Sequence, residues 1–515
     1  MKPSDFLTIL TIVVAVWTVI PKKEKSFILL FFSRAELWAI LTGVLYVHFL
    51  MSFDWLLDNW FSWLSIFTSK KGIPAETWAY IIALLLLAVP TLKVLFGYFS
   101  KSKRQAVIAH YNSLLKQNEI DLLSGYITKY HINYIQQYLI GLSNLPEKEN
   151  IDIILRRRTE SDKAYEVLVK PTRISFAASV YGHILQDEQL VKAGATKYPE
   201  MFATAFRGME TKRASNQDFA KLFIECLFES KNQSFIQELK IVNNSSSSIK
   251  DIEENYELPI LYGLLANTEA AAENYVWYPV GEGAVKSLKF DEEQRAFLVK
   301  EYDHHLEPEL WNYKIWIATV YFNYMVRETI YRDSGWHMWL FYFRHTVDHL
   351  IELIPDDNNY REESEHPSFA HYIIYEQFDI MLGWLRLAKD LNTDNQVIDT
   401  IRCLGWCIHS LCQANDQKLS RSFKKRQLDR LVDVYLDYAY YPDNIACTTA
   451  REWLTKLFLN PKGVDFGIPE ITPEYLSIMT EVWDEYDRIP FTAHGNGGIL
   501  EEFEMNILQQ LGIEI

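Results

Sequence analysis

Residues 78–99 read WAYIIALLLLAVPTLKVLFGYF, an apolar run that only Pro90 and Lys93 interrupt. An α-helix rises about 1.5 Å per residue and the hydrocarbon layer of a bilayer is about 30 Å thick, so roughly 20 residues cross it. The run has this length, and we predict that it is a transmembrane helix. The basic segment KSKR follows at once, at residues 101–104.

Two more apolar runs lie upstream, at residues 6–21 and 37–53, so we predict three spans in all. The first run is short and resembles the core of a signal peptide. However, it is followed by Pro21-Lys22-Lys23 rather than by small residues that would suit cleavage. We therefore interpret it as a retained span.

Residues 54–67 connect the second and third predicted spans and include Trp55, Trp60 and Trp63. Tryptophan prefers the headgroup level of a bilayer because its ring is both apolar and able to donate a hydrogen bond. We predict that this segment is an interfacial helix lying in the membrane plane. A tilted extension of the second span is the alternative.

The charge distribution changes where the apolar runs end. Residues 1–104 contain eleven Lys and Arg against six Asp and Glu, a net charge of +5, whereas the rest contains 40 against 61, a net charge of −21. With three spans, the basic segments before the second and after the third lie on the same side, which the positive-inside rule makes cytoplasmic. We predict a multi-pass protein of the plasma or inner membrane whose acidic body is cytoplasmic. This charge disfavours binding of nucleic acid by the body as a whole.

His48 and Lys93 are ionisable residues inside predicted spans. Such residues are candidates for a function because burying their charge in lipid is costly. Lys93 lies near enough to a span end to extend its ammonium to the interface. The sequence leaves two roles open for the spans, namely an anchor or a bundle that conducts or perturbs the membrane.

From residue 105 onward the periodicity is helical. Apolar side chains recur at i, i+3, i+4, i+7 and i+8, the spacing that lines one face of an amphipathic helix. The clearest example comprises Phe219, Leu222, Phe223, Cys226 and Leu227. We predict a mainly α fold, in which a large all-α helical array follows the membrane spans. Cys403, Cys407 and Cys412 lie on an apolar helix and are interpreted as core side chains.

Two stretches of the body depart from the helical pattern. A small β-hairpin is predicted at residues 151–158 and 164–170, across a polar turn. The tract NNSSSS at residues 243–248 is predicted to be a flexible loop that separates one helical domain, residues 105–242, from a second, residues 249–515.

A group of histidines and carboxylates is the candidate for metal chemistry. His345, His349 and Glu352 share one face of a predicted helix, and His371 and Glu376 lie on the next. Imidazoles and carboxylates that converge from two helices are a common way of holding zinc or iron in a bundle. The five residues therefore form a candidate divalent-metal site, with histidines bonded to neighbours in an aromatic core as the alternative.

A basic cluster and an aromatic segment complete the candidate sites. Arg156, Arg157 and Arg158 are predicted to contact anionic lipid headgroups or an acidic patch of this chain or a partner, with a solvated rim of the β-hairpin as the alternative. An aromatic set exceeds what a thin helical layer needs and suits a large core, an interface or a site for a planar ligand. It comprises Trp311, Trp316, Tyr321, Phe322, Tyr324, Trp336, Trp339, Phe341, Tyr342 and Phe343.

The chain contains no P-loop, no Gly-x-Ser-x-Gly motif and no kinase motif set. We therefore predict a membrane-anchored sensor or scaffold that binds a protein partner or itself. By analogy of architecture, it suits a membrane-perturbing effector of a bacterial anti-phage defence or stress system. A metal-dependent membrane enzyme, or a channel or transport subunit, is the alternative.

Overall fold

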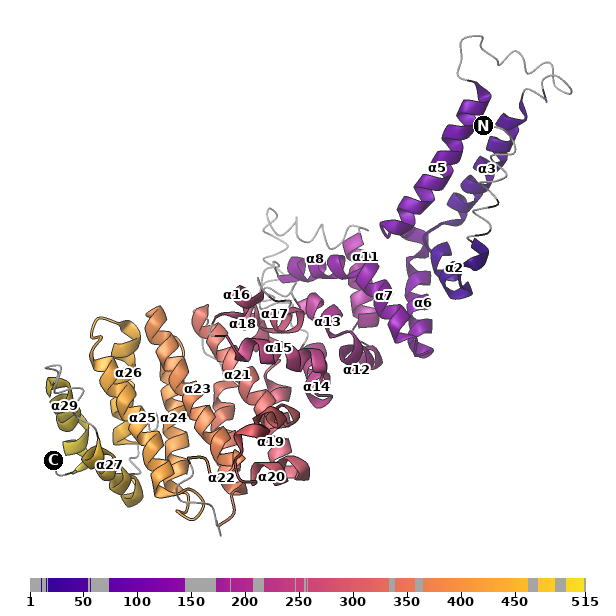
Figure 1. Ribbon diagram of the computed structural model, residues 1–515. Coiled ribbons are helices and arrows are strands. Elements are labelled where there is room, and N and C mark those ends of the chain that lie inside the picture. Colours follow the sequence, from indigo (N-terminus) through magenta and orange to yellow (C-terminus); the bar gives the residue numbers. More distant parts are fainter. Residues whose placement is uncertain are drawn as a thin grey trace, which may run out of the picture. The chain divides into compact units, whose positions relative to one another are not determined.

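The computed structural model describes residues 11, 15, 17–53, 56, 74–143, 173–185, 187–206, 217–245, 247–253, 256, 258–332, 339–356, 365–461, 471–486 and 497–513. They form two compact units (Figure 1), unit 1 with residues 1–141 and 145–194 and unit 2 with residues 142–144 and 195–515. Helices make up most of both units. Within the described ranges the β-structure amounts to one isolated bridge, between Glu301 and Ser368. The predicted mainly α fold is confirmed.

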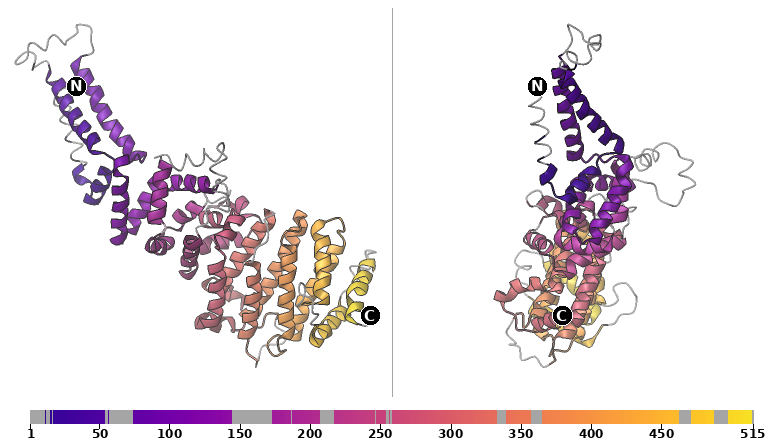
Figure 2. Two further views of the ribbon diagram at one scale, coloured as in Figure 1. Left: turned by 180° about the vertical axis from the view of Figure 1, so that it is seen from behind. Right: turned by 90° about the vertical axis from the view of Figure 1, so that its right-hand side faces the viewer.

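Two long helices of unit 1, α3 (Arg34–Met51) and α5 (Ala75–Leu95), pack against each other as an antiparallel hairpin (Figures 1 and 2). A capping box starts α3, because the Ser33 side chain accepts from the Glu36 N–H and the Glu36 carboxylate accepts from the Ser33 N–H. Small residues allow the close approach: a Cβ on Gly43 would lie 2.8 Å from Leu86 Cδ2. We call α3 and α5 the apolar hairpin.

Both helices of the apolar hairpin are long and apolar enough to cross a membrane, and they coincide with two of the three predicted spans. The remaining predicted span, residues 6–21, lies largely outside the described residues, as does the predicted interfacial helix at residues 54–67. The described chain thus contains two candidate spans, whereas the sequence predicts three.

The chain segments on either side of the apolar hairpin fold together. Helices α2 (Lys22–Leu29), α6 (Arg104–Lys116) and α7 (Ile120–Tyr130) meet through stacked aromatic rings. The Phe27 and Tyr126 ring centroids are 3.7 Å apart, and those of Phe31 and Phe99 are 4.2 Å apart. An ion pair joins Lys23 to Glu119. These contacts hold the two ends of the hairpin at one place.

The rest of unit 1 is helical and includes a buried histidine. After a 3₁₀ turn, η2 (Lys101–Lys103), and helices α6 and α7 come α8 (Ile132–Ser143), α11 (Arg173–Val180), the π turn η4 (Tyr181–Leu185) and α12 (Glu188–Lys197), whose last residues belong to unit 2. His131 lies between α7 and α8, with Nε2 2.9 Å from the Tyr111 hydroxyl. Burial lowers the pKa of His131 to about 3, so this ring is neutral.

Unit 2 begins with mostly short helices and continues into a longer array. The first part comprises α13 (Pro199–Phe206), α14 (Gln217–Glu229), α15 (Gln233–Asn243), α16 (Ile249–Glu253), α17 (Pro259–Leu265), α18 (Thr268–Glu273), α19 (Tyr278–Phe290), α20 (Glu292–Leu298) and the 3₁₀ segment η5 (His304–Asn312). The array comprises α21 (Lys314–Tyr331), η6 (Trp339–Phe341), α22 (Tyr342–Leu353), α23 (Phe369–Leu391), α24 (Val397–Gln413), α25 (Arg421–Ala439), α26 (Ile445–Leu459), α27 (Pro473–Glu485), α29 (Gly497–Phe503), η7 (Glu504–Leu508) and α30 (Gln509–Leu511). Figure 1 shows helices α21 to α26 side by side.

Side-chain caps and large apolar residues explain why the array helices begin and pack where they do. The side chains of Ser420, Asn444 and Thr472 each accept from a backbone N–H at the start of α25, α26 and α27. Trp384 and Trp483 are almost fully buried between the helices. Cys403, Cys407 and Cys412 are also buried, which confirms their prediction as core side chains.

The Ser-rich tract at residues 243–248 lies inside unit 2, although the sequence predicts a domain boundary there. The Tyr324 hydroxyl donates to the Ser245 carbonyl at 2.7 Å, and the Ile249 N–H donates to Glu328 at 2.5 Å. Both Tyr324 and Glu328 belong to α21. The tract is thus tied to a core helix, and the segments on either side of it pack into one unit.

The predicted β-hairpin at residues 151–158 and 164–170 lies outside the described residues. The same holds for Arg156, Arg157 and Arg158, and for Trp55, Trp60 and Trp63. Their predicted membrane contacts remain predictions.

Candidate functional site

The apolar hairpin presents large hydrophobic side chains outward. Only 6% of the apolar stretch in α3 and 11% of that in α5 is buried. Exposed residues include Trp38, Leu41, Leu45 and Tyr46 on α3, and Leu84, Leu85, Val89, Leu92 and Leu95 on α5. Contiguous exposed apolar surface of this kind marks a membrane or protein contact. A core helix of a soluble domain would be mostly buried.

One ion pair links the two helices of the apolar hairpin. Glu36, in the first turn of α3, pairs with Lys93, in the last turn of α5. The Lys93 ammonium also lies 5.4 Å from the centroid of the Phe32 ring. His48, by contrast, is exposed in the last turn of α3. The charge at Lys93 is therefore compensated at the end where the hairpin joins α2 and α6.

Unit 2 contains a pocket of about 670 Å³ between α15, η5, α21 and α23. Three carboxylates and three aromatic rings characterise its lining: Glu307, Glu376, Asp379, Trp311, Trp316 and Tyr372. We call it the acidic aromatic pocket. Its volume lies in the range of small-molecule sites.

The three carboxylates differ in their neighbours. Glu307 accepts from the Tyr302 hydroxyl and lies 2.7 Å from His304 Nδ1, while Asp379 pairs with Arg430. Glu376 is mostly buried, and burial raises its pKa to about 7, with the negative charges of Asp379 and Glu307 acting in the same direction. Its hydrogen bond is to the neutral Tyr372. Near neutral pH this carboxyl group is therefore poised between its two protonation states.

The aromatic residues of the pocket form a connected wall. The Trp316 and Tyr372 rings stack with centroids 6.1 Å apart, and Trp311 meets Trp316 edge-on at 6.3 Å. The Lys240 ammonium lies 5.5 Å from the Trp311 ring centroid. One ring of the wall thus already faces a cation from the protein itself.

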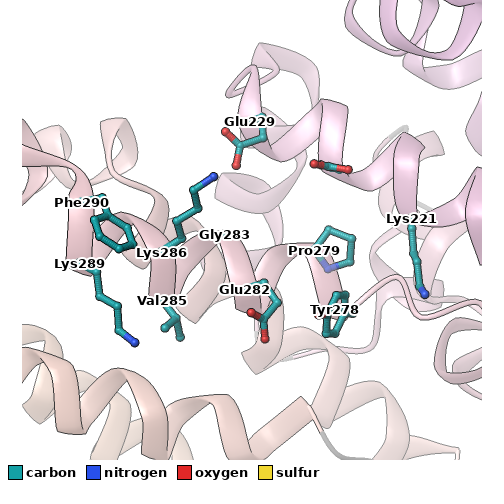
Figure 3. Close-up of a pocket in the computed structure, with 11 residues that line it drawn as sticks. Lys221, Glu229, Tyr278, Pro279, Glu282, Gly283, Val285, Lys286, Lys289 and Phe290 are labelled. Atoms are coloured by element: carbon teal, nitrogen blue, oxygen red, sulfur yellow. The ribbon is translucent and has the colours of Figure 1, made fainter. Parts of the chain in front are cut away.

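A second pocket of about 470 Å³ lies between α14 and α19 (Figure 3). Its charges are mixed, since the lining contains three lysines and three glutamates: Lys221, Lys286, Lys289, Glu225, Glu229 and Glu282. In Figure 3, Lys286 points toward Glu229, while Lys221 and Lys289 lie on opposite sides of the pocket. Several of these groups have internal partners: Lys314 pairs with Glu229, and Tyr342 donates to Glu282 at 3.0 Å. The pocket therefore has no dominant charge.

The five residues of the predicted metal site have different neighbours in the structure. His349 Nδ1 lies 2.8 Å from Glu352, one turn along α22, and His345 is exposed on the same helix. His371 is buried: Nδ1 accepts from the Ser368 hydroxyl at 2.8 Å and Nε2–H donates to the Lys418 carbonyl at 3.1 Å. Glu376 lines the acidic aromatic pocket instead. In the described ranges, the structure contains no group of three or more His, Cys, Asp and Glu residues that could hold a metal ion.

The sequence indicated Glu376 as a candidate site residue, and Trp311 and Trp316 as members of the aromatic set, but not the other polar residues of the pocket. Tyr372, Glu376 and Asp379 recur at i, i+4 and i+7, so they share one face of α23. This polar stripe, next to the buried apolar face of an amphipathic helix, was the available signal. Glu307 and Lys240 come from distant segments, and no spacing in the sequence connects them to it.

No protein-family model, no curated protein and no solved structure matches the chain.

Proposed function

We propose that the chain is a membrane-anchored helical scaffold or sensor whose body faces the cytoplasm. The exposed surface of the apolar hairpin carries this proposal. Burying apolar surface is worth about 25 cal/mol per Å², so large Leu, Trp and Tyr side chains that face outward along two helices need an apolar environment. A bilayer supplies it along the full length of both helices.

The orientation rests on the ends of the hairpin. The contacts of α2 with α6 and α7 hold both ends of the hairpin at one place, as Phe27 stacked on Tyr126 illustrates. Basic residues gather there: Lys22, Lys23 and Lys25 lie before α3 and Arg34 begins it, while Lys101, Lys103 and Arg104 follow α5. By the positive-inside rule this end is cytoplasmic, and the acidic body follows on the same side.

A role as scaffold or sensor follows from the body. Its helical array offers a long surface for a protein partner or a second copy of the chain, as helical arrays commonly do. The body's strong negative charge favours basic partner surfaces over nucleic acid or anionic lipid.

Extraction of cell membranes tests the anchor. We expect the tagged full chain to stay in the pellet after an alkaline carbonate wash and to leave it only in detergent. Leu45→Asp together with Leu85→Asp, one on the outer face of each helix, should remove it from the pellet because carboxylates in lipid are costly. Leu391→Asp, at an exposed apolar position of the body, is the matched control and should remain membrane-bound.

Recovery of the unaltered chain in the carbonate wash would overturn the anchor. The orientation has its own readout: a protease should remove a C-terminal tag in inverted vesicles and spare it in intact cells. Reconstitution into dye-loaded liposomes separates an anchor from a membrane-perturbing bundle. An anchor leaves the dye inside, whereas release would favour the effector role.

A further inference from the structure

We propose that the acidic aromatic pocket binds a small organic cation, a molecule carrying ammonium or guanidinium groups. The pocket lies within unit 2 and does not include the apolar hairpin. The inference therefore goes beyond membrane anchoring and holds independently of it.

The shape and lining of the pocket suit such a ligand. Its volume of about 670 Å³ fits a molecule of small-metabolite size. Trp311, Trp316 and Tyr372 supply aromatic faces on one wall. Aromatic faces attract ammonium and guanidinium groups because the ring quadrupole is negative above the plane. The Lys240 ammonium already makes a cation–π contact of this kind with Trp311.

The arrangement of charges indicates where the ligand's cation belongs. Arg430 balances Asp379, and the Tyr302 hydroxyl and His304 engage Glu307. Glu376 lies beside these two carboxylates and its hydrogen-bond partner is the neutral Tyr372. A ligand ammonium next to Glu376 and the Tyr372 ring would pair with the ionised Glu376 carboxylate and neutralise its charge. An anionic ligand would instead meet three carboxylates, against one ammonium, that of Lys240, which lies over Trp311.

The protonation of Glu376 gives the binding a measurable signature. With a pKa of about 7, the carboxyl group is about half protonated at neutral pH. A cation stabilises the charged form, so binding should expel the remaining protons, about half a proton per ligand at pH 7.

Calorimetric titration of the full chain in detergent at physiological salt tests the proposal, with spermidine as the probe. We expect saturable binding of one equivalent. The apparent enthalpy should change between phosphate and Tris buffer in proportion to the protons released. Glu376→Gln should weaken binding at least tenfold and abolish the proton release. Glu501→Gln, at an exposed position of α29, is the matched control and should leave both unchanged.

Several outcomes would overturn the proposal. These are absence of saturation, equal binding by Glu376→Gln, or binding without proton release in the unaltered protein. The last measurement needs no variant and so remains decisive if Glu376→Gln fails to fold. Succinate, a dicarboxylate of similar size, should not bind. Binding of oligolysine without binding of spermidine would assign the acidic surface to a basic protein partner and would also overturn it.

Discussion

Glu376 affects both the stability of the folded protein and the binding of the proposed cation. A carboxyl group held away from water next to Asp379 and Glu307 favours its protonated form, and only Arg430 and the Tyr372 hydrogen bond act in the opposite direction. Keeping such a group in a folded protein costs free energy once it ionises. When no cation is bound, the ionised Glu376 carboxylate therefore lowers the stability of the folded protein.

The pH dependence of stability should reveal this cost. The pKa of Glu376 is about 7 in the folded state and near its ordinary value of 4.5 in the unfolded state. The folded state therefore holds the proton more tightly, and the contribution of this group falls as pH rises from about 4.5 to 7. We expect Glu376→Gln to stabilise the protein at pH 8 by about 1–3 kcal/mol and to have little effect at pH 4.5.

Thermal unfolding at a series of pH values checks this expectation. Glu501→Gln, whose side chain is exposed, should track the unaltered protein at every pH. Parallel curves for Glu376→Gln and the unaltered protein would show that the carboxyl group titrates normally.

At the scale of elements, α13 and α17 of unit 2 approach each other closely. A Cβ on Gly263 of α17 would lie 2.4 Å from the Ala203 carbonyl oxygen of α13. Backbone cannot move aside as a flexible side chain can, so Gly263→Ala should destabilise the protein by about 1–3 kcal/mol. Gly383→Ala, in α23 with open space around the new methyl group, is the control.

Chemical denaturation of both variants provides the measurement. Gly383→Ala should be neutral or stabilising, since alanine favours a helix over glycine by up to about 1 kcal/mol. Equal midpoints for the two variants would mean that α13 and α17 are not in close contact.

Most elements could be predicted from the sequence because their signals are local. The stripe from Phe219 to Leu227 produces α14, and the apolar run at residues 78–99 produces α5. The contacts of α21 with the Ser-rich tract and the residue after it could not be predicted, because Tyr324 and Glu328 lie about 80 residues from Ser245 and Ile249. The pocket depends on similar distant contacts: Glu376 was recognisable as a candidate, but Lys240 and Glu307 join it only through the packing of helices.

At the scale of the whole molecule, each compact unit buries a neutral histidine. Burial lowers the pKa of His131 in unit 1 to about 3 and that of His371 in unit 2 to about 4. Unfolding exposes both rings, which then take up protons below their ordinary value of 6.5. Each histidine therefore contributes stability that is complete above pH 6.5 and is lost as pH falls toward the folded pKa.

Acidification from pH 7 to pH 5 should consequently loosen both units, by about 2 kcal/mol for each histidine. Hydrogen exchange of the full chain, corrected for intrinsic rates, should show lost protection in α6 and α7 around His131. His131→Gln, which can still bond Tyr111, should reduce this loss, whereas His305→Gln at an exposed position should not. Unchanged protection at pH 5 would contradict the assignment of a neutral buried ring.

The Glu36–Lys93 ion pair also bears on how the proposed membrane hairpin is made. During synthesis, α3 emerges first, and its carboxylate is in place 57 residues before the lysine that it neutralises. A single helix carrying Lys93 would enter lipid with an unmatched charge near its end, whereas a pair of helices carries a matched one. Because α3 is synthesised before α5, we expect α5 to insert next to α3. The two helices then enter the membrane together rather than one at a time.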